Sequence, residues 1–425
     1  MRRITYSLFG ILILAVSGLG ALSLIGLGGE RLLEKDKYPS FIIESFKTIQ
    51  ENYWEQLENE ALAELFRLSG ERVSGGVSFS FATTTPQEVA RTLHKYVENL
   101  KSEQEKKEFV TLLVHTVLQN LKPQGRSALY TKKQETALRE TVANINNDKS
   151  LYTTLGLAEG ASEESVTDAF TKKKEVLEQG EQTTETKKEL EELVYAKEVL
   201  TDRETKILYD EQKIEPTVFA KPLTPEIAYI HIERFSPTTF NDFIRVSDDL
   251  DDENLNTLIL DLRGNIGGAI DLLQWFLGPF IGKDQYAYEF FHQGEYTPFK
   301  TQVGWLPSLV KYKRVIVLID DKVQSSGEVM AATLQKYNVG VLVGVKTRGW
   351  GTVENTYPLE TTLDDTEKFS LFLVNNITLR SDGQPIEGRG VDPTIDIHDP
   401  DWKEKLNVYF NDNELIETVA KLVEK

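Results

Sequence analysis

Cysteine is absent from the 425-residue chain, which excludes thiol catalysis, disulfide bonds and cysteine-ligated metal. The five histidines show no spacing of the His-x-x-x-His type, so we expect neither a metal site nor a cofactor. Basic residues are too few to balance the acidic ones, since 48 Lys and Arg against 67 Asp and Glu leave a net charge of -19. Without a basic stripe, this charge argues against a nucleic-acid partner.

An uncharged stretch runs from Leu8 to Gly29, directly after Met1-Arg2-Arg3. Its length suits a membrane-spanning helix, and the arginines before it favour an N-terminus in the cytoplasm. A cleaved signal peptide is the alternative, because the stretch is rich in Gly, Ala and Ser. Either interpretation places the body of the protein outside the cytoplasm. The length of the chain predicts two or three folded units. The patterns along the chain divide it into an anchor (1–30), a helical N-terminal unit (31–146), a second helical unit (147–212) and a core (213–425).

The N-terminal unit shows helical periodicity. Apolar residues recur at three- and four-residue steps over 39–69, and Thr85 stands as an N-cap before Pro86 and Glu88. Nothing in this unit indicates catalysis.

Residues 147–212 contain a second recognisable pattern. Tyr152-Thr153-Thr154-Leu155-Gly156-Leu157 leads to Ser162, which can cap a helix carrying Val166, Phe170 and Val176, and a second helix closes with Thr201-Asp202. This order of features resembles a J domain. In that family a His-Pro-Asp tripeptide between the two helices stimulates the ATPase of the 70-kilodalton chaperone. Here the corresponding segment is 177–182 and lacks the tripeptide. We therefore interpret this unit as a helical hairpin for packing or docking.

The sequence pattern of the core, residues 213–425, predicts an α/β fold. Short β-branched runs at 257–262 and 315–319 each end in a glycine or serine loop followed by a helical segment, and another strand follows at 341–343. Alternating strands and helices gather such loops at one edge of a sheet. Two glycines, Gly267 and Gly268, and Ser325 at a strand-to-helix junction could there form an oxyanion site beside a nucleophile. A phosphate site, or a serine that only caps a helix, fits the same residues.

Three strings follow one another in the core: Leu260-Asp261-Leu262-Arg263-Gly264-Asn265-x-Gly267-Gly268, Ser325-x-x-Glu328 and Gly388-x-Gly390-Val391-x-Pro393. These strings and their order are similar to those of the C-terminal processing (tail-specific) serine peptidases. The resemblance implies a crotonase/ClpP-like core of strand-turn-helix units, with the helical N-terminal unit and the J-like unit attached. It also implies a polypeptide substrate.

Matched residue by residue, the resemblance makes Ser325 the nucleophile and the Ser326 N–H one oxyanion donor, with Gly267 or Gly268 as the other. Glu328 matches the glutamate that follows the nucleophile by three residues. The family's general base is a lysine in a Phe-Gly-Lys-Gly string, but here the string reads Arg348-Gly349-Trp350-Gly351. Tryptophan cannot accept the serine proton.

Two residues are candidates to replace the lysine: Lys346, four residues before Trp350, and His292. A second departure is that the J-like unit occupies the position of the family's PDZ domain, which puts C-terminal substrate selection in doubt.

Two hypotheses remain for the function of the protein. The protein is either an impaired serine endopeptidase with a replacement base, or an inactive pseudopeptidase that binds client chains as an adaptor or scaffold. Oligomeric state is not determined by the sequence.

Overall fold

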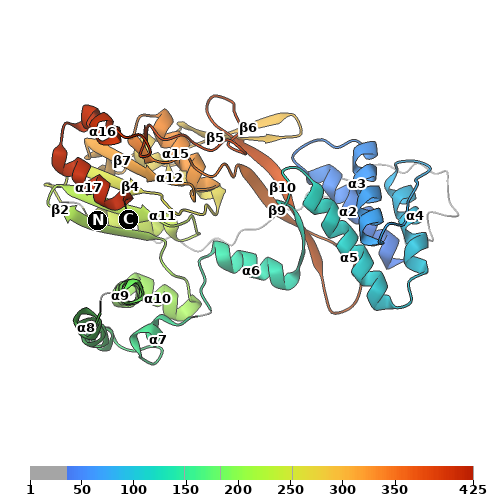
Figure 1. Cartoon of the computed structure of the whole chain (residues 1–425), viewed down its shortest axis with the longest axis horizontal. Helices are drawn as coiled ribbons and strands as arrows, with labels where there is room; N and C mark the ends of the chain where they lie inside the picture. Colours follow the sequence, from blue (N-terminus) through green and yellow to red (C-terminus); the bar gives the residue numbers. More distant parts are fainter. Residues whose placement is uncertain (1–35, 148, 182, 251, 425) are drawn as a thin grey trace.

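The computed structural model describes residues 36–424 except 148, 182 and 251. Figure 1 shows a core of sheet and helices, a bundle of N-terminal helices joined to it by the long strands β9 and β10, and a small helical unit below the core. Within the described ranges, no helix is long and apolar enough to cross a membrane. The predicted anchor at 1–30 lies outside the described residues.

The core sheet has six strands in the order β11-β8-β7-β4-β3-β2. All neighbours are parallel except β2 and β3. All five residues of β4 are buried, as expected for a parallel strand covered on both faces. The strands are β2 (Val218–Thr224), β3 (Ile227–Ile232), β4 (Thr257–Asp261), β7 (Arg314–Ile319), β8 (Val341–Gly344) and β11 (Ile395–Asp396).

Helices cover the two faces of this sheet. Leu260 and Val317 pack against the face that carries α11 and α15, whereas Ile259 and Leu318 pack against α16 and α17. Alternate side chains of one strand point to opposite faces, so two separate apolar clusters form. The helices are α11 (Thr239–Asp249), η1 (Ile270–Leu272), α12 (Leu273–Phe276), α13 (Gly278–Ile281), α14 (Pro307–Val310), α15 (Ser326–Lys336), α16 (Trp402–Phe410) and α17 (Asn413–Val423).

A second, antiparallel sheet links the core to the N-terminal helices. Its order is β1-β10-β5-β6, with β9 paired to β10. Phe41 of α2 packs edge-on against Phe369 of β10, and Leu371 and Leu373 lie in the same apolar cluster. The strands are β1 (Ala128–Thr131), β5 (Tyr286–His292), β6 (Glu295–Lys300), β9 (Thr352–Pro358) and β10 (Phe369–Leu379). The helices are α2 (Lys37–Asn52), α3 (Asn59–Val73), α4 (Pro86–Glu98) and α5 (Glu103–Asn120).

The predicted N-cap at Thr85 is confirmed, since its side chain accepts the Glu88 N–H. The N-terminal helices are nevertheless not self-contained, because β10 supplies part of their apolar core.

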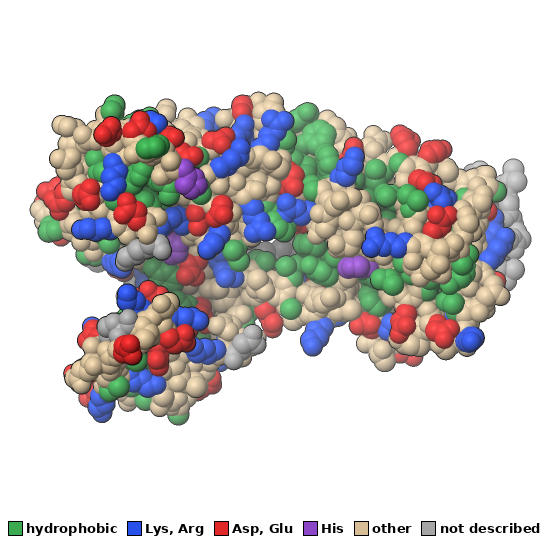
Figure 2. All heavy atoms as spheres, viewed as in Figure 1, with side chains coloured by type: hydrophobic (Ala, Val, Ile, Leu, Met, Phe, Trp, Pro, Cys, Tyr) green, Lys and Arg blue, Asp and Glu red, His purple; other side chains and the backbone are tan. Residues whose placement is uncertain are grey.

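The J-like unit is a cluster of four helices with a small core of its own, reached through α6 (Lys132–Val142). Ser162 caps α8 as predicted, but Val176, expected on the packed face, is 70% exposed. An open notch separates the unit from the core on the face shown in Figure 2, where acidic and basic side chains are interspersed. The resemblance to a J domain stays a prediction. The helices are α7 (Leu151–Leu155), α8 (Glu163–Gln179), α9 (Thr184–Thr201) and α10 (Arg203–Gln212).

Gly344, at the end of β8, allows β7 and β8 to approach closely. Its φ is +142°, and a Cβ there would lie 1.8 Å from the Ile319 carbonyl oxygen. We expect Gly344→Ala to lower the free energy of unfolding by about 3 kcal/mol or more, because backbone must move. The matched control is Gly383→Ala, which also has a positive φ but open space around it, and should cost about 1 kcal/mol. Urea unfolding followed by tryptophan fluorescence measures both, and equal losses would contradict the steric argument.

Candidate active site

The turn after β4 is built around a buried asparagine. Asn265 donates from Nδ2 to the Ile232 carbonyl (2.8 Å) and accepts the Gly267 N–H at Oδ1 (2.8 Å). Asp261 holds the start of the turn by accepting the Arg263 N–H and pairing with its guanidinium (2.6 Å). A Cβ at Gly268 would lie 2.2 Å from the Phe235 carbonyl oxygen, so only glycine fits. The turn is therefore fixed before any ligand arrives.

Ser325 lies at the junction between the loop after β7 and α15, in a strained conformation with φ +54° and ψ -124°. Its N–H donates to the Trp350 carbonyl (3.0 Å) and to Glu328 Oε2 (3.0 Å). A Cβ on Gly267 would lie 3.2 Å from Ser325 Oγ, which places the glycine turn directly against the hydroxyl. Such strain is retained where the surrounding structure enforces it, and it is typical of nucleophiles presented on a sharp strand-to-helix turn.

Two backbone N–H groups beside Ser325 have no acceptor among the described residues: those of Gly268 and Ser326. The Ser326 hydroxyl donates to the Gly268 carbonyl (3.0 Å) and so ties the two segments together. The Gly267 N–H, by contrast, is already donated to Asn265. Of the two glycines that the sequence left open, the geometry therefore favours Gly268 as the second donor to an oxyanion.

Glu328 is fully buried and connects Ser325 to the loop after β8. Oε1 accepts from the Thr347 hydroxyl (2.6 Å) and the Gly349 N–H (2.6 Å), while Oε2 accepts from the Trp350 N–H (2.7 Å) and Ser325 N–H. Burial raises the pKa of this carboxyl, and the hydrogen bonds act in the opposite direction. The contacts give Glu328 a positioning role.

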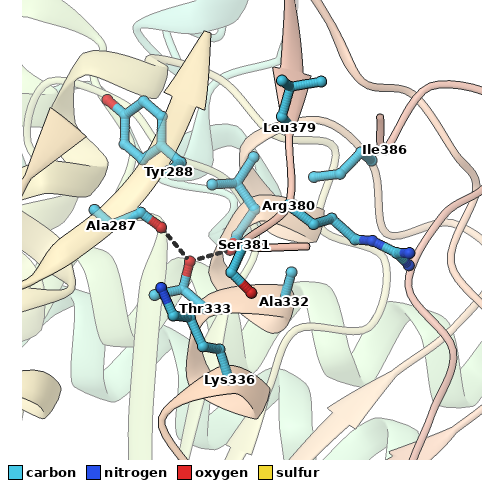
Figure 3. A pocket seen from close by; sticks show the side chains of 10 residues that line it. Ala287, Tyr288, Ala332, Thr333, Lys336, Leu379, Arg380, Ser381 and Ile386 are labelled. Atoms are coloured by element: carbon cyan, nitrogen blue, oxygen red, sulfur yellow. Dashed lines mark hydrogen bonds between the residues drawn. The ribbon is translucent and has the colours of Figure 1, made fainter. Parts of the chain in front are cut away.

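The Ser325 hydroxyl opens onto a cavity of about 480 Å³. Its lining comes from the glycine turn, α6 and β9, and it includes Arg234, Asp271, Phe290 and Glu354. A second cavity of only about 10 Å³ lies between α15 and β5, where Thr333 donates to the Ala287 carbonyl (2.8 Å; Figure 3). The large cavity has the size and the polar groups of a binding site, whereas the small one holds at most a water-sized group.

Comparison with known proteins places this arrangement in a family. Residues 226–397 match the profile of peptidase family S41. These residues are an S41 peptidase domain. The resemblance seen in the sequence is thereby confirmed for the family, and the α/β fold is confirmed with it.

The S41 domain carries the similarity to named relatives. The chain is similar to two carboxy-terminal processing proteases of Bacillus subtilis (strain 168). It is 29% identical to CtpB over 210 residues, which cover 47% of this chain and 42% of CtpB. It is 30% identical to CtpA over 187 residues, which cover 44% of this chain and 38% of CtpA. The match thus spans less than half the length of either relative.

A solved structure, the photosystem II D1 C-terminal processing protease, has a similar fold, with a TM-score of 0.50 and 11% identity. The match covers 85% of this chain and 93% of that protein, and at this identity it shows the shared fold alone.

Trp350 of the S41 domain is held firmly in the position where the resemblance expects lysine. The Arg126 guanidinium lies over its ring, with 3.3 Å between Cζ and the ring centroid. Glu387 accepts from Arg126 Nη2 (3.1 Å) and from the Gly351 N–H (2.8 Å). The indole Nε1 donates to Glu354 Oε1 (3.4 Å). Tryptophan is therefore an integral part of this site.

Neither predicted replacement for lysine is brought to Ser325. Lys346 is exposed, pairs with Asp392 (3.2 Å) and is not among the cavity-lining residues. His292 bonds the Asn375 carbonyl through Nδ1 (2.6 Å) at the end of β5, also outside that lining. Sequence reasoning gave no role to Arg126, Glu354 or Glu387. Glu387 directly precedes the Gly388-x-Gly390 string, but no residue of that string indicated its function. Arg126 lies just before β1, and Glu354 lies on β9, in a sheet that the sequence did not predict.

Glu328→Gln should destabilise the fold around the site, although it leaves the number of non-hydrogen atoms unchanged. An amide would direct its NH2 group at N–H or hydroxyl donors and leave at least one of them unpaired. We expect a loss of about 2–4 kcal/mol in the free energy of unfolding. Glu404→Gln, at an exposed position of α16, is the control and should change it by less than about 0.5 kcal/mol. Both losses in the free energy of unfolding are measured by urea unfolding. Similar losses for the two variants would contradict a structural role of the buried Glu328 carboxylate.

Proposed function

We propose that this protein is a serine-type endopeptidase that acts on polypeptides through Ser325, without a lysine base. The observation that carries the proposal is the strained conformation of Ser325 beside the two free N–H groups of Gly268 and Ser326. A nucleophile and donors for the developing oxyanion are the requirements of acyl transfer. The names of the CtpA and CtpB relatives as processing proteases support the same reaction.

The shape of the site supports an extended polypeptide as substrate. Among the described strands, β9 pairs only with β10, so its other edge is free. Residues 352–355 of β9 line the cavity that contains Ser325. A free strand edge can bind an extended chain by backbone hydrogen bonds, and side-chain pockets then select its residues.

Tryptophan in place of lysine at position 350 implies a slow enzyme unless another group of the site takes the serine proton. General bases contribute about 10²–10⁴-fold to such reactions, and the indole of Trp350 cannot serve as one. The second candidate function, an inactive client-binding adaptor, is favoured by the Arg126–Trp350 stack, which fills the lysine position with a rigid group.

We further propose that residues 1–30 anchor the protein in a membrane, with its main body on the extracytoplasmic side. The uncharged stretch from Leu8 to Gly29 and the arginines before it support this proposal.

The peptidase proposal predicts slow cleavage of casein and of C-terminally tagged peptides that disappears in Ser325→Ala. Ser80→Ala, an exposed serine of the N-terminal unit, is the matched control and should cleave like the native chain. Cleavage is measured by mass spectrometry of the products. Activity that survives in Ser325→Ala would reject Ser325 as the nucleophile.

The adaptor alternative predicts that the native chain cleaves no peptide and that substitutions at the site can restore cleavage. Trp350→Lys should restore Ser325-dependent cleavage when it is combined with Glu354→Gln, because no carboxylate then keeps the new ammonium group charged. A silent native chain with an active double variant would establish an intact cleft that lacks only its base.

The anchor proposal predicts that the full-length chain sediments with membranes and stays there after an alkaline carbonate wash. Removal of residues 1–30 should release it. A mature chain whose mass shows that this segment has been removed would instead favour the signal peptide.

A further inference from the structure

The cavity at Ser325 contains few groups able to take a proton. Among the described residues that line it, none is a histidine or a lysine, and the carboxylates are those of Asp271 and Glu354. Asp271 is exposed, whereas Glu354 is half-buried on β9 and accepts a hydrogen bond from the Trp350 indole. The choice of a base within the cavity therefore narrows to a carboxylate, and the better enclosed one is Glu354.

Glu354 is held by hydrogen bonds to one oxygen only. Oε1 accepts from the Thr352 hydroxyl (2.5 Å) and from the Trp350 indole N–H (3.4 Å). No group of the described residues donates to Oε2, and this oxygen is not among the buried unpaired atoms. One oxygen thus orients the carboxylate, and the other is left to accept a proton.

Glu328, the other glutamate at the site, is not available for this role. Both of its oxygens are occupied by four donors that fix the Ser325 turn. To take the serine proton it would have to release backbone N–H groups in a buried place, which is costly.

We propose that Glu354 is the general base for Ser325, in place of the missing lysine. This inference rests on the peptidase function proposed above. Trp350 then has a role of its own: its indole N–H orients the carboxylate that replaces the lysine. Trp350 is a positioning residue, and Glu354 is a catalytic residue.

The step balances as an ordinary acyl transfer. The Ser325 hydroxyl proton passes to Glu354 Oε2, directly or through one water, while Oγ bonds to the substrate carbonyl carbon. The carbonyl electron pair moves to its oxygen, which the Gly268 and Ser326 N–H groups stabilise. The C–N bond then breaks, and the leaving amine takes the proton from Glu354. Water attacks the acyl group in the same way, Glu354 accepts its proton, and that proton returns to Ser325 when the acid leaves.

The electrostatic surroundings raise the pKa of the Glu354 carboxyl above its ordinary value. Burial raises the pKa of the Glu354 carboxyl; the donors Thr352 and Trp350 and the charge of Arg126 lower it, and Glu387 raises it. Burial raises the pKa of Tyr130 on β1, and the charge of Glu354 adds to this increase. A carboxylate of raised pKa is a stronger base, and it acts only above that pKa, so the rate should increase as the pH rises through it.

The test is the pH dependence of Ser325-dependent peptide cleavage and of Ser325 labelling by a fluorophosphonate probe. Glu354→Gln should lower kcat/KM by about 100-fold or more and abolish its rise with pH. Glu354→Asp should retain the rise at a reduced rate. Glu295→Gln, an exposed glutamate of β6, is the control and should leave both unchanged. The thermal midpoint of Glu354→Gln shows whether its fold is intact.

Three outcomes overturn the inference, and they are distinguishable. Ser325-dependent cleavage with an unchanged pH profile in Glu354→Gln rejects Glu354 as the base and leaves the peptidase function standing. A native chain that neither cleaves nor reacts with the probe at any pH rejects the base and the peptidase function together. If the thermal midpoint of Glu354→Gln is lowered, the conservative variant Glu354→Asp decides. A cleavage rate that does not rise with pH in Glu354→Asp then rejects Glu354 as the base.

Discussion

The geometry of the site depends on one buried carboxylate. Glu328 is fixed to α15 by its backbone and accepts four hydrogen bonds from two segments: one from Ser325, and three from Thr347, Gly349 and Trp350 in the loop after β8. Because the group is buried, no water can substitute for a missing donor, and each segment has one stable position. The strained backbone of Ser325 is retained because this network leaves it no alternative.

The site is composite, although the S41 match covers only residues 226–397. Arg126 comes from the segment after α5 and stacks on Trp350, and Leu138 and Thr141 of α6 line the cavity. The N-terminal helices are in turn packed on β10, whose partner β9 carries Glu354. Changes in the N-terminal part of the chain are thereby connected to the site through packed side chains.

The tryptophan at 350 is best understood together with its neighbours. A lysine there would face Arg126 and Glu354, whereas the indole stacks on the first and donates to the second. The replacement removes a proton acceptor and adds an N–H donor aimed at a carboxylate. The chemistry of the site thus depends on a set of residues, of which the sequence motif shows only one.

Local patterns in the sequence were enough to predict the parallel core strands, the glycine turn, the serine junction and the N-cap at Thr85. Each of these depends on residues close together in the chain: β-branched runs, glycines at positive φ and a capping hydroxyl. The second sheet was not predicted. Although β5 and β6, and β9 and β10, pair as neighbours along the chain, the pairings of β10 with β1 and with β5 join residues far apart in the sequence, and no local pattern shows them.

The sequence alone determined which residues form the serine turn and that lysine is missing, since both are matters of residue identity and spacing. Only the tertiary structure decided that the Gly267 N–H is already occupied, that Lys346 points to Asp392, and that Glu354 shares the cavity with Ser325. These facts depend on how distant segments pack, and packing is set by the whole chain rather than by any local pattern.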